Sequence, residues 1–206
     1  VQEFLQQHRL WLSEVDLVVF NAGFAGYGFF PSQSTELMER QLQVMLGSVL
    51  ILSHELWPIL QQRSGSACVF IGSMAADFSI PGFSAYNAAK AGLDQFAESL
   101  LVESGSAGPQ VVNCRLGDIR TGFNQQVDRV DSGSAPEKLA WMRIEEAMTV
   151  APEPDLVVKR LRRILVKGRS GSWNIGSPVQ CFWAPMAARI LPRAWMRTLV
   201  RRYYNL

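Results

Sequence analysis

A tyrosine and a lysine stand four residues apart at Tyr86 and Lys90, in the sequence Tyr-Asn-Ala-Ala-Lys. Side chains at positions i and i+4 of a helix lie on the same face, so the phenol and the ammonium can converge. An ammonium beside a phenol favours the phenolate, and we therefore expect a pKa for Tyr86 below its usual value of about 10. Such a tyrosine suits general acid–base catalysis.

Ser73 lies thirteen residues before Tyr86, directly after the apolar run at residues 66–71. Its hydroxyl can bond the same substrate oxygen that Tyr86 protonates. Two donors on one oxygen stabilise the charge that develops there when hydride arrives at the adjacent carbon. Each feature alone has a simpler explanation, because a serine after a strand is commonly a turn or cap residue.

Apolar runs alternate with helical patterns along most of the chain. We expect helices at residues 1–13, 34–62, 84–103 and 152–166, and strands at residues 15–20, 66–71, 111–114 and 172–175. This order predicts an α/β fold, a doubly wound parallel sheet with helices on both faces. In such sheets ligands bind at the carboxyl ends of the strands, where Asn21-Ala22-Gly23, Ser73 and Gly117 fall.

Two later segments depart from this alternation. Residues 124–137 are polar, with few large apolar side chains, and we expect a mobile lid over the site. Residues 182–206 form an aromatic and basic helical tail, broken near Pro192. The tail can make peripheral contact with a membrane, or its aromatic residues can pack on the domain or a neighbouring subunit. The second interpretation is favoured, because the basic side of the tail has few apolar residues.

The composition narrows the class of protein. The 206 residues include 20 basic and 18 acidic ones, and a net charge of +2 gives no reason to expect a nucleic-acid partner. The cysteines Cys68, Cys114 and Cys181 lie far apart without a CxxC spacing, which indicates a reducing, cytoplasmic location. The histidines His8 and His54 have no acidic or cysteine companions at ligand spacing, so we expect no metal. No run reaches the roughly 18 uninterrupted apolar residues of a membrane span.

The motifs together resemble the short-chain dehydrogenase/reductase family. That family has Asn-Ala-Gly after its fourth strand, a serine after its fifth, and Tyr-x-x-x-Lys on the next helix; these correspond to Asn21-Ala22-Gly23, Ser73, Tyr86 and Lys90. The resemblance implies a three-layer Rossmann-type fold and an NAD or NADP cofactor. It also implies that Tyr86 donates or accepts the proton, that Ser73 positions the substrate, and that Lys90 binds the nicotinamide ribose.

The resemblance assigns further cofactor contacts. Leu116-Gly117-Asp118-Ile119-Arg120-Thr121 matches the family's Pro-Gly-x-Val/Ile-x-Thr, with leucine in place of proline. Gly117 lets the backbone approach a ligand, and Ile119 and Thr121 are expected at the nicotinamide carboxamide and the nearby phosphate. The Asn21-Ala22-Gly23 turn is expected to line the same cofactor site.

Two departures from the family pattern affect the expected activity. Met45 stands where the family has a catalytic asparagine that holds a water in the proton relay, and a thioether cannot make that hydrogen bond. The sequence also has no Thr-Gly-x-x-x-Gly-x-Gly loop, and it begins with Val1 rather than methionine. We therefore expect an incomplete domain over residues 1–206 that lacks the family's first three strands. Alone, it should not bind NAD(P) measurably.

The sequence predicts an oxidoreductase that transfers hydride between NAD(P) and a carbonyl or alcohol. The alternative is a non-catalytic scaffold or pseudoenzyme on the same fold, which the two departures favour. An aromatic wall predicts an apolar substrate; its members are Tyr27, Phe29, Phe30, Phe78 and Phe83. By the family's pattern, the helices at residues 34–62 and 84–103 are expected to form a homodimer or homotetramer interface.

Overall fold

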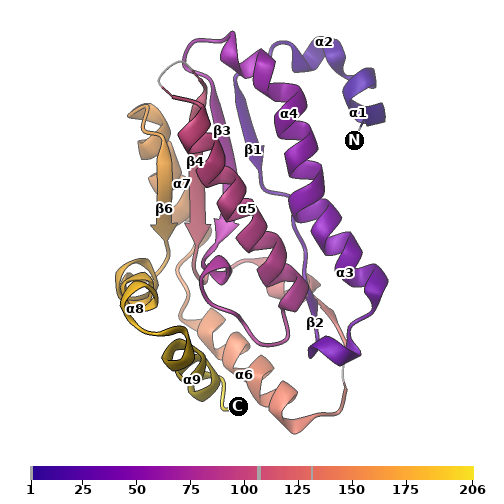
Figure 1. Cartoon of the computed structure of the whole chain (residues 1–206), viewed down its shortest axis with the longest axis vertical. Helices are drawn as coiled ribbons and strands as arrows, with labels where there is room; N and C mark the ends of the chain where they lie inside the picture. Colours follow the sequence, from indigo (N-terminus) through magenta and orange to yellow (C-terminus); the bar gives the residue numbers. More distant parts are fainter. Residues whose placement is uncertain (1, 106–107, 131) are drawn as a thin grey trace.

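A four-stranded parallel sheet forms the centre of the protein in the computed structural model, which describes residues 2–105, 108–130 and 132–206 (Figure 1). The strand order is β1-β3-β4-β6. The strands are β1 (Leu17–Phe20), β3 (Ala67–Ser73), β4 (Gln110–Leu116) and β6 (Gly171–Ile175). Helices cover both faces of this sheet, which confirms the predicted three-layer, doubly wound architecture.

Alternating side chains of the strands divide between two apolar layers. Phe20, Phe70 and Val111 face the layer that contains α4 (Ser48–Gln61) and α5 (Ser84–Glu103). The intervening residues Val69 and Val112 face α7 (Pro154–Val166) on the opposite side. Because successive side chains of a strand point to opposite faces, the position of each functional residue along its strand fixes the side of the sheet on which it lies.

Helix α5 has the predicted bounds and lies close against β3 and β4. Its buried face is made largely of small side chains, Ala85, Ala89 and Ala97, with Leu93 between them. Small residues allow close approach of the helix to the strands, so polar groups from the two elements can meet. Lys90 is buried on this side of the helix as well, next to Ala89.

The helix expected at residues 34–62 is divided into three parts. Ser34 caps α3 (Thr35–Leu42) by accepting a hydrogen bond from the Leu37 N–H at 3.2 Å. A π-helical turn, η2 (Gln43–Gly47), joins α3 to α4. By length and composition alone, Thr35–Gln61 could cross a membrane. Its residues Val49 and Leu60, however, pack in the core against the sheet.

Short elements of regular structure occupy much of the segment expected to be a mobile lid, residues 124–137, of which residue 131 lies outside the described residues. The short helix η4 (Gly122–Gln126) is followed by β5 (Asp128–Arg129), which pairs in parallel with β2 (Gly26–Tyr27). Helix α6 (Ala135–Thr149), which the sequence did not predict, begins within the same segment. The Tyr27 hydroxyl donates a hydrogen bond to the Glu137 carbonyl at 2.6 Å and so anchors α6.

The two ends of the chain lie at opposite ends of the molecule (Figure 1). The helix expected at residues 1–13 is two short helices, α1 (Gln2–Gln7) and α2 (Arg9–Leu12), and Val1 is outside the described residues. The C-terminal tail starts earlier than expected, with the π-helical turn η5 (Val179–Trp183). It continues as α8 (Ala184–Ile190) and α9 (Arg193–Tyr203), with the predicted break at Pro192. Two further short helices are η1 (Phe30–Ser32) and η3 (Met74–Ala76).

Strand β1 forms one edge of the sheet, as expected for the strand after the N-terminal helix. It pairs only with β3 among the described strands. On the face of β1 away from α4, Leu17 and Val19 are 45% and 44% exposed. An exposed edge with apolar side chains is a site of association.

We predict that Val19→Lys reduces self-association of the protein on concentration, because a charged side chain blocks pairing at a strand edge. Light scattering across a concentration series measures the effect. Val18→Lys is the matched control: Val18 packs against the core, so the same substitution there should lower the thermal unfolding temperature. Equal association of Val19→Lys and the unsubstituted protein would contradict the prediction.

Candidate active site

A cavity of about 750 Å³ opens at the carboxyl ends of the strands. Eight of its lining residues belong to the predicted site, and six of these are Ser73, Tyr86, Lys90, Gly117, Ile119 and Thr121. Asn21 and Gly23 also line it, whereas Ala22 is exposed and is not among the lining residues. The structure therefore brings all but one of the predicted site residues into one cavity.

Ser73 and Tyr86 line the same cavity, and hydrogen bonding by the Ser73 side chain acts to lower the pKa of Tyr86. Ser73 ends β3, and its Oγ also accepts a hydrogen bond from the Ala75 N–H at 3.1 Å. Tyr86 lies in the first turns of α5, with Phe83 and Phe123 packed around its ring. The serine is thus both a cap of η3 and a partner of the tyrosine.

The predicted lowering of the Tyr86 pKa is wrong for this structure. Burial raises the pKa of Tyr86, the hydrogen bond with Ser73 opposes that rise, and the negative charge of Asp118 adds to it. Removal from water penalises the phenolate more than its neighbours stabilise it. The neutral hydroxyl is therefore the favoured form, and it is able to donate a proton.

The Lys90 ammonium contacts the backbone of the sheet and also lies near the Tyr86 ring. Lys90 is 7% exposed, and its Nζ donates a hydrogen bond to the Ile71 carbonyl at 2.8 Å. Nζ also lies 5.7 Å from the centre of the Tyr86 ring. Burial lowers the pKa of Lys90 to about 8. The lysine therefore ties α5 to the end of β3 beside Tyr86.

An ion-pair cluster fixes the loop that follows Ser73. The Arg115 guanidinium on β4 contacts the carboxylates of Asp77 at 2.5 Å and Asp94 at 2.9 Å. The Asn113 amide donates a further hydrogen bond to Asp94 at 2.8 Å. Since Asp77 ends η3 and Asp94 lies on α5, the cluster joins three elements around the site. The three charged side chains are partly buried, so the ion pairs hold these elements together beside the site.

Two polar residues of the cavity were missed by the sequence analysis, Asp118 and Gln180. Gln180 Nε2 donates a hydrogen bond to Asp118 Oδ2 at 2.5 Å, and Gln180 Oε1 accepts one from the Asp118 N–H at 3.1 Å. Burial raises the pKa of Asp118, and the bond from Gln180 opposes the rise. Asp118 was visible inside the Leu-Gly-Asp-Ile-Arg-Thr motif. The tail segment gave no sign that Gln180 would reach it.

The Met45 side chain does not reach the cavity, where the family's asparagine was expected to hold a relay water. It is 1% exposed, lies in the π-helical turn η2, and is not among the cavity-lining residues. A Cβ atom added at Gly23 would lie 3.5 Å from its sulfur. Met45 therefore fills the space beneath the Asn21-Ala22-Gly23 turn.

The predicted aromatic wall is only partly correct. Phe78 and Phe83 line the cavity, but Tyr27 is buried in the core and Phe30 is exposed away from it. Phe29 is also not among the lining residues. Part of the remaining apolar wall comes from α6, α9 and the residue after α9, which the sequence analysis did not assign to the site: Ile144, Ala147, Met148, Leu199, Val200, Tyr203 and Tyr204. One face of the tail therefore packs over the site.

Comparison with known proteins identifies the class of protein that this fold and site define. A model of the short chain dehydrogenase family matches residues 1–131, and the chain belongs to that family. An SDR family protein 7-like dehydrogenase/reductase of Drosophila melanogaster is 27% identical over 77% of this chain and 52% of its own length. The uncharacterized oxidoreductase YbbO of Escherichia coli K12 is 29% identical over 84% of this chain and 62% of its own.

Solved structures show the same fold at low sequence identity. A short-chain dehydrogenase from Streptomyces avermitilis has a TM-score of 0.76 at 21% identity, over 95% of this chain and 72% of that one. A short-chain dehydrogenase from Sphingobium yanoikuyae in complex with NADPH has a TM-score of 0.68 at 21% identity, over 97% and 71%. The chain spans about half to two-thirds of the length of the curated relatives it matches.

We predict that the unfolding free energy rises by about 1 kcal/mol between about pH 7 and 8.5 because of Lys90. Its pKa is about 8 when folded and 10.5 when unfolded, so the folded protein releases its proton first. The contribution of Lys90 to the unfolding free energy is therefore gained as the pH rises above 8, and it is lost as the pH falls through 8. Chemical denaturation at both pH values measures the change.

Lys90→Met provides the comparison for this prediction. Cys68 and Cys114, whose pKa values burial raises to about 12, act in the opposite direction but are present in both proteins. The difference in pH dependence between the two proteins thus isolates Lys90. If the two proteins showed the same pH dependence of the unfolding free energy, the pKa of Lys90 would not be lowered in the folded state.

Proposed function

We propose that this chain provides the catalytic and substrate-binding part of an NAD(P)-dependent oxidoreductase that acts on a carbonyl or alcohol. The observation that carries the proposal is the meeting of Ser73, Tyr86 and Lys90 at one end of a single cavity. In reactions that transfer hydride, a tyrosine can exchange the proton, a serine can bond the substrate oxygen and a lysine can bind the cofactor ribose. Membership of the short chain dehydrogenase family supports these assignments.

The cavity has the size and lining expected for the nicotinamide end of the cofactor. Its volume of about 750 Å³ falls within the usual range of small-molecule sites, about 300–1,000 Å³. We assign Lys90, Ile119 and Thr121 to the nicotinamide riboside, with Asn21 and Gly23 beside it. Several structural neighbours are complexes with NADPH or NADH, which supports NAD or NADP as the cofactor.

When bound, NAD(P)H supplies the hydride for the substrate carbonyl carbon. The Tyr86 hydroxyl then donates its proton to the carbonyl oxygen, and the Ser73 hydroxyl donates a hydrogen bond to the same oxygen. The raised pKa of Tyr86 suits a group that holds its proton until negative charge develops. In the oxidation direction the same oxygen of Tyr86 accepts the alcohol proton.

The substrate is proposed to be apolar, because Phe78, Phe83, Met148 and Val200 line the same cavity as Tyr86. A non-catalytic protein on the same fold is the alternative. The burial of Met45 away from the cavity favours it, because no side chain at that position holds a relay water. The free thiols of Cys68, Cys114 and Cys181 are consistent with the proposed cytoplasmic location.

We also propose a homodimer or homotetramer formed through α4 and α5. Leu50 and Ile51 are exposed on α4, and Val102 is exposed on α5. Light scattering at micromolar concentration should give at least twice the monomer mass, and Leu50→Glu/Ile51→Glu should reduce it. A monomer mass for the unsubstituted protein would exclude this assembly.

We predict that Tyr86→Phe lowers turnover by about two to four orders of magnitude, because it removes only the proton-donating hydroxyl. The measurement is NAD(P)H consumption with apolar carbonyl compounds, made on the natural protein that contains this sequence. Ser73→Ala should be less severe but clearly impaired.

Tyr27→Phe is the control for the loss of a tyrosine hydroxyl. Its hydroxyl bonds the Glu137 carbonyl in the core, so this variant should lose stability and keep turnover. Turnover of Tyr86→Phe close to that of the unsubstituted protein would exclude the proposed mechanism. No turnover by the unsubstituted protein with either dinucleotide would favour the non-catalytic alternative.

A further inference from the structure

The charges of this chain are strongly separated along the sequence. All 18 acidic residues lie within residues 1–155, together with nine of the 20 basic ones. Residues 156–206 contain the other eleven basic residues and no acidic residue. The small net charge of +2 therefore conceals an acidic part and a strongly basic part, and the basic part includes the whole C-terminal tail.

Large apolar side chains are exposed in the same tail. Eight such side chains lie on η5, α8 and α9, and four of these are Phe182, Trp183, Ile190 and Trp195. Five arginines are exposed among them: Arg189, Arg193, Arg197, Arg201 and Arg202. We call these nine residues the C-terminal surface. In the part of the chain that the structure describes, none of these arginines forms a salt bridge.

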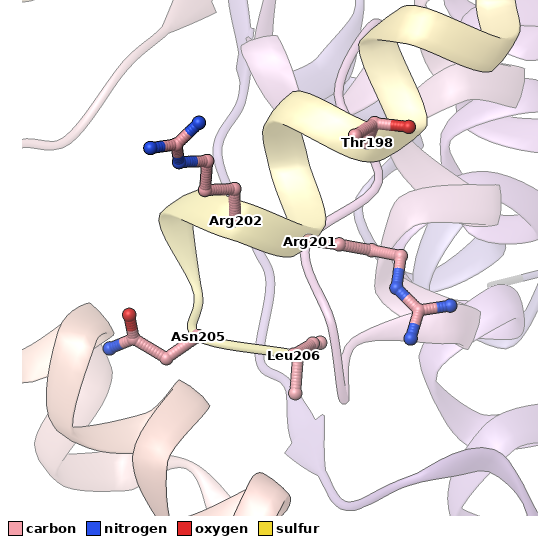
Figure 2. A pocket seen from close by; sticks show the side chains of 5 residues that line it. All are labelled: Thr198, Arg201, Arg202, Asn205 and Leu206. Carbon is pink, nitrogen blue, oxygen red and sulfur yellow. The ribbon is translucent and has the colours of Figure 1, made fainter.

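Helix α9 has one face on the protein and one face toward solvent. Val200 and Tyr204 line the catalytic cavity, whereas Trp195 and Arg202, seven positions apart, share the opposite face. Figure 2 shows Arg201 and Arg202 extending in different directions from the last turn, beside an open hollow of about 520 Å³. Thr198, Asn205 and Leu206 complete the lining of this hollow.

We propose that the C-terminal surface docks on an anionic lipid bilayer. Tryptophan and isoleucine side chains would enter the headgroup region, and the unpaired arginines would contact lipid phosphates. A second copy of the chain is disfavoured as the partner, because two such surfaces repel each other. Duplex nucleic acid is also disfavoured, because its bases are stacked inside the helix and the exposed apolar side chains would find no contact on its phosphate backbone.

Docking through α9 would place the apolar wall of the catalytic cavity next to the lipid. An apolar carbonyl compound dissolved in the bilayer could then reach Tyr86 along α9, a consequence that rests on the proposed function. Binding to vesicles itself requires neither cofactor nor turnover. The docking proposal and the proposed function can therefore fail independently.

Co-sedimentation of the 206-residue protein with vesicles tests the proposal. The protein should pellet with phosphatidylcholine vesicles that contain phosphatidylglycerol, and not with phosphatidylcholine alone. Arg201→Glu/Arg202→Glu should weaken binding roughly 30-fold or more, since each basic residue near an anionic surface contributes a factor of about five. High salt should weaken binding in the same direction.

Tryptophan variants separate insertion from charge attraction. Trp195→Ser should lose binding, whereas Trp11→Ser should bind like the unsubstituted protein. The two side chains are matched, 65% and 63% exposed, but Trp11 lies on α2 at the far end of the molecule (Figure 1). Equal effects of the two substitutions would overturn the proposal.

Three other outcomes would also overturn it. Equal binding to neutral and anionic vesicles would exclude the arginine contacts. Binding to duplex DNA as tight as to anionic vesicles, unaffected by Trp195→Ser, would identify a general polyanion surface. Absence of vesicle binding, together with self-association that Arg201→Glu/Arg202→Glu abolishes, would identify an interface between copies of the chain.

Discussion

The removal of the Lys90 ammonium from water is the constraint on which the site depends. A buried cation needs a strong acceptor, and here the acceptor is the Ile71 carbonyl, two residues before Ser73. The bond therefore holds α5 in register with the end of β3. Tyr86 lies one turn earlier on the same face of α5, so this register also brings its hydroxyl to Ser73.

Other buried polar side chains extend the same principle to the loops around the cavity. Gln41 Oε1 accepts a hydrogen bond from the Gly26 N–H at 3.0 Å, and Gln33 Nε2 donates one to the Gly82 carbonyl at 2.9 Å. Arg115 holds the loop after Ser73 through Asp77. Each bond satisfies backbone or charged groups that would otherwise be buried without a partner. The irregular segments are thus fixed by side chains distant in sequence.

Local patterns were sufficient to predict the central elements and most of the site. Helix α5 and the four sheet strands follow from apolar periodicity, and the carboxyl ends of parallel strands necessarily bring Ser73, Gly117 and Asn21 to one edge. Helix α6 was missed because its apolar residues are spread around the helix and form no clear stripe at helical spacing. Its burial depends on Tyr27, more than a hundred residues away.

The errors within the site have the same non-local origin. The i, i+4 spacing of Tyr86 and Lys90 revealed their shared face but not the depth of burial, which determines the direction of the Tyr86 pKa. The contact of Gln180 with Asp118 joins residues 62 positions apart, and no spacing rule predicts it. Similarly, the net charge concealed the separation of acidic and basic residues, which only a charge count by segment reveals.

The π-helical turn at Met45 has a consequence for substitution at this position. A π-helical turn holds one residue more than an α-helical turn. This turn is present in η2 with a buried methionine at position 45, so the backbone shape here does not require an asparagine. Replacement at position 45 therefore alters the available chemistry without requiring a new helix geometry. The space beneath the Asn21-Ala22-Gly23 turn is thus filled by an apolar side chain on a backbone that keeps its π-helical turn.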